Sequence, residues 1–564
     1  MVRKLPQPQG VRLYLSVDFG ATHSGVSYAT STNGKVIPIV SWPGSSDPLR
    51  KIPTCLVYDS LGNVRAWGLE ARDINLRRGW IRCEWFKLWL DPKYTISPSL
   101  PVGKHPGDVI VDFLSSLWMY VKERILFKYT LDTLSKWDII AVPASWDAHT
   151  SLLLREVAIK AGLAVQVSHE DMYWQERLHI IPETEASAIH SVALARFLPN
   201  QKFVICDAGG GTIDIATYDI PRALGMPEIA EVPLRSGSYC GSLFLDVHFR
   251  ELVRARLADH PSHLDEASLA HFLLTFSGSE KLHYKGSVDD TKMFHFRCLH
   301  LQDSDDPSAG LENGKLIIPG NVLRHEVFDP VINQVVRAIN LHIHSSRVHV
   351  DALLLVGGFS ANPYLFQRIN DEFKSSVPSI IRPADGDTAS NRGAARSGLY
   401  PTVTSVIPSQ SVVMRVRLPA EPEDKRMRPT YITTSGGTHF CENSRVDVEL
   451  RKFSAVPSGM HPRTPSEAFT SSSGDLDSIF DTVIYTSNVD ETLRYTDQGE
   501  TNELCLCRVD LKELPSFKEQ AMVTTPKGFY TDFELGFEMG TAEIRGELLC
   551  KQRKFGSVTF DLCG

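Results

Sequence analysis

The chain has 564 residues, of which 42% are hydrophobic and 22% charged, and its 59 basic and 67 acidic residues give a net charge of −8. This length is too great for one compact core and predicts roughly three or four packing units. The acidic balance disfavours nucleic acid as a partner, and ten cysteines without metal-site or disulfide spacing favour buried thiols in a reducing compartment.

The N-terminal segment does not resemble a secretory signal, because no continuous apolar run follows its basic residues and Asp18 interrupts the next one. No stretch approaches the ~20 apolar residues that are needed to span a bilayer. The sequence therefore predicts a cytoplasmic protein without a membrane partner.

The first 400 residues alternate between strand patterns and helix patterns. In chain order, we predict a strand at 11–19, a turn at 20–25, a strand at 26–29, a helix at 109–126, a strand at 137–142, a helix at 147–161, a helix at 185–198, a strand–turn–strand unit at 203–219, a helix at 328–343, a strand at 351–356, a helix starting at 362–363 and a closely packed helix at 388–399. Asn362 and Pro363 suit the cap and the first position of their helix.

The pattern changes at Tyr400-Pro401, where we predict a domain boundary. Alternating segments typical of β-structure follow at 412–418, 446–450, 503–509 and 529–537. Residues 457–478 are rich in Ser, Pro and Gly and predict a loop. The chain is thus expected to consist of an α/β region at 1–400 and a mostly β region at 401–564.

Two segments share one pattern, VDFGATHSGV at 17–26 and CDAGGGTIDI at 206–215. Each has an aspartate at the end of a strand, a glycine turn with a threonine, and a second strand, which suggests an internal duplication. Glycine turns let backbone N–H groups approach phosphate oxygens, and Asp18 and Asp207 could hold a hydrated magnesium ion.

Other phosphate motifs are excluded by the local context. Neither turn has the lysine of a P-loop, and neither leads into the helix of a dinucleotide fingerprint. Each turn alone is also compatible with an ordinary hairpin. The two together, with the glycine pair at 357–358, favour one shared phosphate site.

In their order along residues 11–400, these segments resemble the nucleotide-binding region of the 70-kilodalton heat-shock chaperones. The two turns are similar to the phosphate segments of that family, and LLLVGGFSANPYLFQRI is similar to its adenosine segment. IIAVPASWDAHTSLLLREVAIKAGL and PETEASAIHSVA are similar to its lobe-linking segments. CGSLFLD at 240–246 and WFKLWL at 85–90 look closer to divergent heat-shock-like proteins of fungi and of the animal twelve-A branch.

The resemblance implies an α/β fold with a two-lobed, actin-like (duplicated ribonuclease H-like) ATPase domain. Lobe I would cover about 1–200 and lobe II about 201–400. A mostly β C-terminal domain at 401–564, without a helical lid, would follow. The implied cofactors are ATP or ADP and Mg.

The resemblance also implies roles for individual residues. Asp18 and Asp207 would hold magnesium through water. Lys87 would stabilise charge on the transferred phosphoryl group, and Asp207 or Glu183 would orient the attacking water. The residues expected to wrap the phosphates are Gly20, Ala21, Thr22 and His23 on one side and Gly209, Gly210, Gly211 and Thr212 on the other. Those expected near the adenosine are Gly357, Gly358 and Phe359, with Glu280 and Asp387 as candidate sugar contacts.

Structural alternatives stay open for several of these residues. Lys87 could be a surface lysine, and Glu183 could be a carboxylate at a helix start. Gly357 and Gly358 could simply form a strand-to-helix turn, and Asp387 could support that turn. Glu280 is weakly aligned, because His283 stands where the family has a lysine.

The sequence departs from the main chaperones at several points. Ala21 replaces a threonine beside the γ-phosphate, Thr184 replaces the proline after Glu183, and no leucine-rich linker is visible near residue 400. The leading hypothesis is a chaperone-like protein whose lobes close on ATP with slow, Mg-dependent hydrolysis. Its β-region would meet a protein client or co-chaperone. The alternatives are a nucleotide-binding scaffold with negligible turnover and a small-molecule kinase on the same fold.

Overall fold

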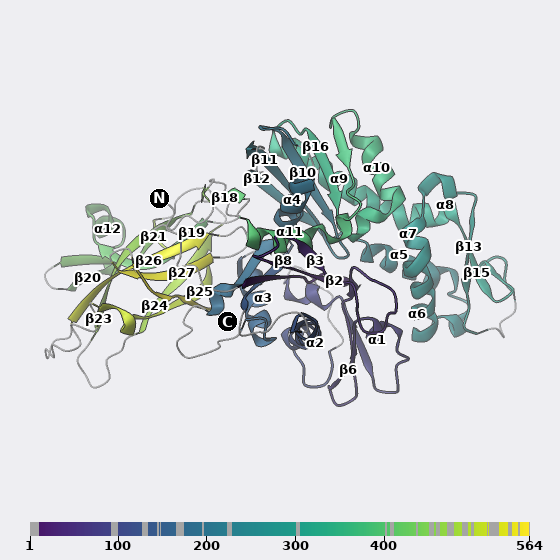
Figure 1. The fold of residues 1–564 in the computed structure, drawn as a ribbon, viewed down its shortest axis with the longest axis horizontal. Helices are drawn as coiled ribbons and strands as arrows, with labels where there is room; N and C mark the ends of the chain where they lie inside the picture. The colour runs from purple at the N-terminus through teal and green to yellow at the C-terminus, as the bar shows by residue number, and fades with distance from the viewer. Residues whose placement is uncertain are drawn as a thin grey trace. The chain divides into compact units, whose positions relative to one another are not determined.

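The structure is a computed structural model, and it describes most of the first 400 residues and separate segments beyond them. The described residues are 11–91, 100–126, 134–143, 146, 148–164, 174–194, 197–222, 228–300, 305–400, 403–406, 411–435, 438–450, 456–457, 463–470, 479–487, 494–497, 501–515, 517, 529–539, 544–550 and 553–562. They form two compact units (Figure 1). The first lies within Met1–Ser145 and Pro182–Thr402, and the second within Trp146–Ile181 and Val403–Gly564.

The first sheet of the first unit is built around β1 (Val11–Asp18), an apolar strand whose described side chains are almost all buried, as expected for a central strand. It pairs antiparallel with β2 (His23–Thr30) and parallel with β8 (Leu134–Val142). Two short strands, β3 (Val36–Pro38) and β4 (Ile52–Pro53), add to β2. The predicted turn at 20–25 is therefore too long, because pairing with β4 extends β2 back to His23.

The second sheet repeats this arrangement. Strand β10 (Lys202–Ala208) pairs antiparallel with β11 (Ile213–Arg222) and parallel with β16 (Ala352–Val356). Strand β12 (Glu228–Ser238) extends the sheet beside β11, and β17 (Ser379–Ile381) extends it beside β16. Asp18 ends β1 and Asp207 lies one residue before the end of β10, as the internal duplication predicts.

The first unit also contains helices, short strands and helical turns. The helices are α1 (Gly68–Asp73), α2 (Pro106–Leu126), α4 (Glu183–Leu194), α5 (Leu243–Arg256), α6 (Glu266–Thr275), α7 (Lys281–His283), α8 (Gly320–Leu323), α9 (Asp329–Ser346), α10 (Pro363–Phe373) and α11 (Ala389–Leu399). The remaining elements include β5 (Cys55–Tyr58), β6 (Val64–Trp67), β7 (Ile81–Glu84), β13 (Met293–Arg297), β14 (Leu311–Glu312), β15 (Lys315–Pro319) and the helical turns η1 (Phe86–Leu90), η5 (Phe276–Glu280), η8 (Gly358–Ala361) and η9 (Gly386–Thr388).

Helix α10 begins as predicted, and helix α11 packs as closely as predicted. The Asn362 side chain accepts a hydrogen bond from the Leu365 N–H and caps α10, with Pro363 at the first position. Helix α11 packs closely on α4, since a β-carbon placed on Gly393 would lie 1.6 Å from the Ala186 carbonyl oxygen. This mixed α/β arrangement fits the actin-like fold that the sequence analysis expects.

The second unit contains mostly antiparallel strands. Its sheets have the orders β20-β21-β19-β24-β25-β29 and β23-β26-β27-β28. Its elements are α3 (Ala148–Lys160), β9 (Leu178–Pro182, whose last residue belongs to the first unit), β18 (Val403–Val406), β19 (Ser411–Pro419), α12 (Pro422–Met427), β20 (Ile432–Ser435), β21 (Thr438–Leu450), β22 (Val456–Pro457), β23 (Arg463–Thr470), β24 (Ile479–Ser487), β25 (Thr501–Asp510), β26 (Phe529–Met539), β27 (Ile544–Cys550), β28 (Arg553–Ser557) and β29 (Thr559–Leu562).

The predicted loop over 457–478 is wrong at 463–470, where β23 pairs with β26. Pro465 lacks a backbone N–H, but β23 lies at the edge of its sheet, where this loss is tolerated. The rest of that predicted loop beyond Pro457 lies outside the described residues. Cys505 and Cys507 are buried free thiols on β25, as the sequence predicts.

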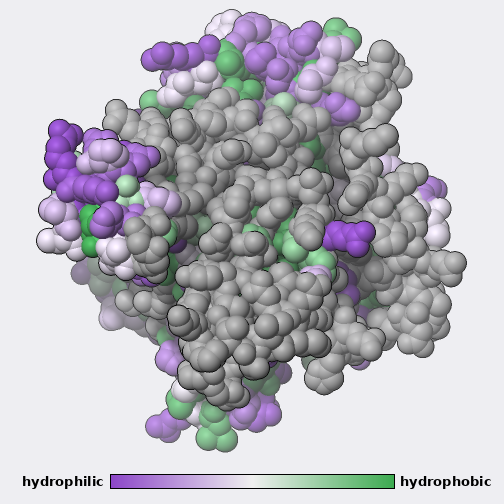
Figure 2. All heavy atoms as spheres, turned by 90° about the vertical axis from the view of Figure 1, so that its left-hand side faces the viewer, coloured by the Kyte–Doolittle hydropathy of each residue, from purple (hydrophilic) through white to green (hydrophobic). Residues whose placement is uncertain are grey.

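The described surface is mixed in character. On the face drawn in Figure 2, hydrophilic residues predominate at the visible edges, and smaller apolar groups lie among them. None of the helices that the structure describes has the length and the apolar composition needed to cross a bilayer.

Candidate functional site

The two predicted phosphate turns lie against each other. A β-carbon placed on Gly210 would lie 2.2 Å from Thr22 Oγ1, and one on Gly211 would lie 3.0 Å from the β-carbon of Ala21. Each turn is also tight in itself, because the Gly209 N–H donates to the Thr212 carbonyl at 3.0 Å and a β-carbon on Gly20 would lie 2.1 Å from the His23 carbonyl oxygen. The structure thus brings together the residues that the sequence analysis assigned to the two sides of the phosphates.

Four acidic side chains gather beside these turns. This carboxylate cluster consists of Asp18, Glu183, Asp207 and Asp214, all of them buried. Burial raises the pKa of Asp207 to about 7, and the charges of Asp18 and Asp214 add to this effect. The Ser187 hydroxyl, on α4, donates a hydrogen bond to Asp207 Oδ2 at 3.1 Å. A nearby positive charge would favour the ionised form of these carboxyl groups.

Lys87 is one cation of this region. It lies on η1, its side chain is 3% exposed, and its Nζ lies 2.6 Å from Glu183 Oε1. The alternative of a surface lysine is therefore wrong. Glu183 is the first residue of α4, two residues before the predicted helix start, so it is both a helix-start carboxylate and an ion-pair partner. Burial raises the pKa of Glu183 to about 8, with Lys87 opposing and the neighbouring carboxylates adding to the shift.

Sequence reasoning missed two charged residues at this place. Asp214 lies directly opposite Asp207 in the β10–β11 pairing, so the strand–turn–strand pattern could have revealed it. Lys51 precedes β4, and its Nζ lies 2.7 Å from Asp18 Oδ2. Burial lowers the pKa of Lys51, but the nearby carboxylates, chiefly Asp18, outweigh this and raise it. Nothing in the local sequence around Lys51 signals this contact.

The carboxylate pKa shifts predict how stability depends on pH. The folded pKa values of Asp207 and Glu183 lie above the unfolded ones. The two groups therefore stabilise the folded state at low pH, and this stabilisation is lost as pH rises through 7 and 8. Burial lowers the pKa of His342 to about 4, and burial with nearby cations also lowers that of His23. The folded pKa values of these two histidines lie below the unfolded value of about 6.5, so they lower stability only as the pH falls below about 6.5.

We therefore expect the nucleotide-free protein to lose on the order of 2 kcal/mol of unfolding free energy between pH 6.5 and 8.5. Urea unfolding at fixed ionic strength measures this loss. Asp207→Asn should reduce the slope, because the amide does not titrate. Stability that rises over this range would contradict the assignment.

The predicted adenosine turn adjoins the carboxylate cluster. Gly357 has a φ of +84°, and a β-carbon there would lie 2.3 Å from Asp207 Oδ1. Gly358 faces open space, with nothing within 4 Å of such a β-carbon. Phe359, by contrast, is 4% exposed and packs in the hydrophobic core of the second sheet and its helices.

The two candidate sugar contacts have other partners. Asp387 Oδ1 lies 2.8 Å from Arg50 Nη1, so η9 is joined to the segment that precedes β4. Glu280 Oε2 lies 3.8 Å from Lys292 Nζ, and no described contact joins Glu280 to the carboxylate cluster. The roles of Glu280 and Asp387 as sugar contacts stay predictions.

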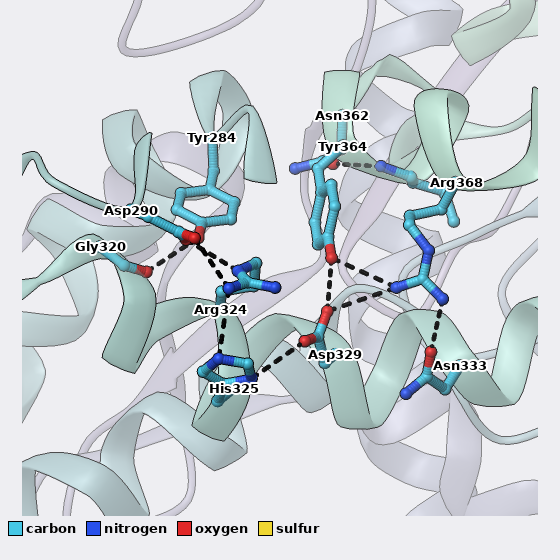
Figure 3. Close-up of polar contacts among 11 residues, drawn as sticks. Tyr284, Asp290, Gly320, Arg324, His325, Asp329, Asn333, Asn362, Tyr364 and Arg368 are labelled. Atoms are coloured by element: carbon cyan, nitrogen blue, oxygen red, sulfur yellow. Dashed lines mark hydrogen bonds and ion pairs between the residues drawn. The ribbon is translucent and has the colours of Figure 1, made fainter. Parts of the chain in front are cut away.

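The segment that carries Glu280 is nevertheless held close to the adenosine turn. Asn362 Nδ2 donates to the Lys281 carbonyl at 2.7 Å. Figure 3 shows the network around it, in which the Tyr364 hydroxyl donates to Asp329 at 2.5 Å and Arg368 Nη2 donates to Asn333 at 2.8 Å. These contacts fix α10 against α9.

Two glycine turns thus lie against each other beside buried carboxylates and lysines. An arrangement of this class could hold a magnesium–phosphate group.

No protein-family model matches the chain. It is 21% identical to Heat shock 70 kDa protein 12A of Homo sapiens over 485 residues, which cover 71% of each chain. The protein of the same name from Mus musculus is 22% identical over 501 residues, again 71% of each chain.

Heat shock 70 kDa protein 12B of Homo sapiens is 21% identical over 498 residues, which cover 72% of this chain and 71% of that protein. The resemblance to divergent 70-kilodalton heat-shock-like proteins is thus confirmed. The chain is a distant relative of these proteins.

Proposed function

We propose that this protein binds ATP or ADP with magnesium between two actin-like lobes. One lobe would be built on β1, β2 and β8 and the other on β10, β11 and β16. The observation that carries the proposal is the contact between the two duplicated turns, with Asp18 and Asp207 in one carboxylate cluster. The distant heat-shock relatives support the same conclusion.

The residues present fit magnesium and a triphosphate. Magnesium prefers oxygen ligands and keeps several of its waters. In the part of the chain that the structure describes, no group of three or more His, Cys, Asp or Glu side chains is spaced to ligate a metal directly. Asp18 and Asp207 would hold the ion through water, and the N–H groups of Gly20, Gly210 and Gly211 would donate to phosphate oxygens, while the Gly209 N–H keeps its bond to the Thr212 carbonyl.

The bound magnesium nucleotide would supply the phosphoryl group for transfer to water. Lys87 would place its charge beside that group, and Ser187 would orient Asp207. Hydrolysis is expected to be slow, because Ala21 offers no hydroxyl and Glu183 is already bound to Lys87. In this proposal the protein is a cytoplasmic, chaperone-like ATPase whose C-terminal strands meet a protein client or co-chaperone.

A nucleotide-binding scaffold with negligible turnover is the second candidate. It is favoured by the 2.6 Å contact between Lys87 and Glu183, since a carboxylate held in an ion pair is poorly placed to orient water. Single-turnover hydrolysis separates the two candidates. A rate equal to those of Lys87→Ala and Asp207→Ala favours the scaffold.

The binding proposal itself is tested by calorimetric titration. We expect ATP to bind in the presence of magnesium, and Asp207→Ala to weaken binding at least about tenfold, because a magnesium-orienting carboxylate is lost. Asp481→Ala is the matched control, since Asp481 belongs to the second unit and its described ion-pair partner is Arg508, which is not part of the carboxylate cluster.

Limited proteolysis gives a second readout of the same proposal. Magnesium and ATP should protect the wild-type chain, because lobe closure reduces local opening. Absence of calorimetric heat in the wild type together with identical digests would contradict nucleotide binding.

A further inference from the structure

A lysine that no motif predicted lies beside the first phosphate turn. Lys51 Nζ is 2.7 Å from Asp18 Oδ2, and its side chain is 19% exposed. An ammonium group has three N–H donors, and this contact uses one of them. The group is therefore anchored on one side and still accessible to water.

We propose that Lys51 is a ligand of the terminal phosphate, held in place by Asp18, and that it makes the site selective for triphosphate over diphosphate. This inference rests on the proposed nucleotide binding. It adds that Lys51 supplies, next to Asp18, part of the positive charge that a bound nucleotide requires.

The position of Lys51 is set by the backbone of the phosphate turn itself. Strand β4 follows Lys51 directly and pairs with the start of β2, with Ile52 opposite Ser24. The next residue after β4, Thr54, donates from its N–H to the Thr22 carbonyl at 2.8 Å and from its hydroxyl to the Gly20 carbonyl at 2.7 Å. Lys51 is therefore positioned by the same hydrogen bonds that shape the turn.

A glycine makes room for the lysine stem. A β-carbon placed on Gly25 would lie 3.1 Å from Lys51 Cγ, and Gly25 lies directly opposite Asp18 in the β1–β2 pairing. The stem thus passes over the one position of β2 that carries no side chain, and its ammonium reaches Asp18. On the other side, the Arg50 contact to Asp387 ties this segment to η9.

The charges explain why such a lysine matters. The cluster has four carboxyl groups beside only two lysines, Lys87 and Lys51, so once its carboxyl groups are ionised it repels an entering phosphate. A lysine ammonium is a compact point charge suited to phosphate oxygens. Because Lys51 supplies charge close to the turn, we expect ATP binding to persist when magnesium is removed.

The test is calorimetric titration of ATP and ADP into the full chain, once with magnesium and once with a chelator. Lys51→Met removes the charge and keeps the stem, and Lys51→Arg keeps the charge. Lys104→Met is the matched control, because Lys104 Nζ also lies 2.7 Å from an aspartate, Asp112, outside the carboxylate cluster. Thermal unfolding of each variant verifies that it is folded.

We expect wild-type protein to bind ATP in the chelator, and Lys51→Met to weaken this binding about ten- to a hundredfold with a smaller effect on ADP. Lys51→Arg should retain most of the affinity, and Lys104→Met should match the wild type. Tighter magnesium–ATP binding by Lys51→Met would overturn the inference, since Lys51 would then only compete with the metal. Equal effects of Lys51→Met and Lys104→Met would also overturn it.

The two proposals fail in different ways. Wild-type protein that binds no nucleotide in either condition contradicts the proposed function and the inference with it. Wild-type protein that binds ATP only with magnesium, with Lys51→Met unchanged, contradicts the inference alone.

Discussion

Replacing Gly393 by alanine is expected to destabilise the first unit by about 3 kcal/mol or more, although alanine is the better helix former. Gly393 lies on α11, and a β-carbon there would lie 1.6 Å from the Ala186 carbonyl oxygen of α4. The obstacle is backbone rather than a flexible side chain, so the two helices would have to separate. Chemical unfolding with a constant m-value measures the loss.

A matched glycine gives the opposite expectation. Gly278 is also helical, within η5, and a β-carbon there meets nothing within 4 Å. Gly278→Ala should be neutral or stabilising by up to about 1 kcal/mol, because alanine loses less backbone entropy than glycine. If both alanine variants changed stability equally, close packing of α4 and α11 would not be the cause.

The Gly393 substitution also bears on the site. Helix α4 carries Glu183, which contacts Lys87, and Ser187, which contacts Asp207. A shift of this helix would move both side chains together. We therefore expect Gly393→Ala to weaken magnesium–ATP binding, whereas Gly278→Ala should not.

Alanine at Gly357 and at Gly358 should separate folding from binding. Gly357 has a φ of +84°, and a β-carbon there would lie 2.3 Å from Asp207 Oδ1 and 2.4 Å from the Ala208 carbonyl oxygen. The left-handed conformation and the contacts together should cost Gly357→Ala about 2–4 kcal/mol of stability. Thermal or chemical unfolding of the nucleotide-free protein measures this cost.

Gly358→Ala is the adjacent control, since its β-carbon would face open space. We expect wild-type stability for this variant but weaker ATP binding, because the added methyl would occupy space assigned to the adenosine. Loss of stability in both variants would indicate a purely structural turn. Unchanged ATP affinity in Gly358→Ala would place the adenosine elsewhere.

Several features of the site were predictable because they depend on neighbours in sequence. The strand–turn–strand pattern around Asp18 and Asp207 is local, and so is the cap of α10 at Asn362. Small residues at 388–399 predict a tight helix contact, and α11 makes one. Such features follow from backbone sterics and hydrogen bonds within a few residues, which sequence patterns report directly.

Other features depend on partners from distant parts of the chain. The charge partner of Lys87 is the first residue of α4, and Lys51 reaches Asp18 only because β4 adds to β2. The Phe359 side chain packs in the core of the second sheet and its helices, and its approach to the adenosine stays a prediction. Burial and ion pairing of this kind arise when separate elements pack, so local sequence carries no sign of them.

By itself, the sequence thus determined the duplicated turns, the two strand-end aspartates and the distant heat-shock relationship. Only the tertiary structure decided that the turns touch, that Lys87 is buried against Glu183, and that Lys51 belongs to the site. The physical reason is that hydrogen-bond and steric preferences of a turn act over a few residues, whereas the charge balance of a buried site is set by whichever elements the fold brings together.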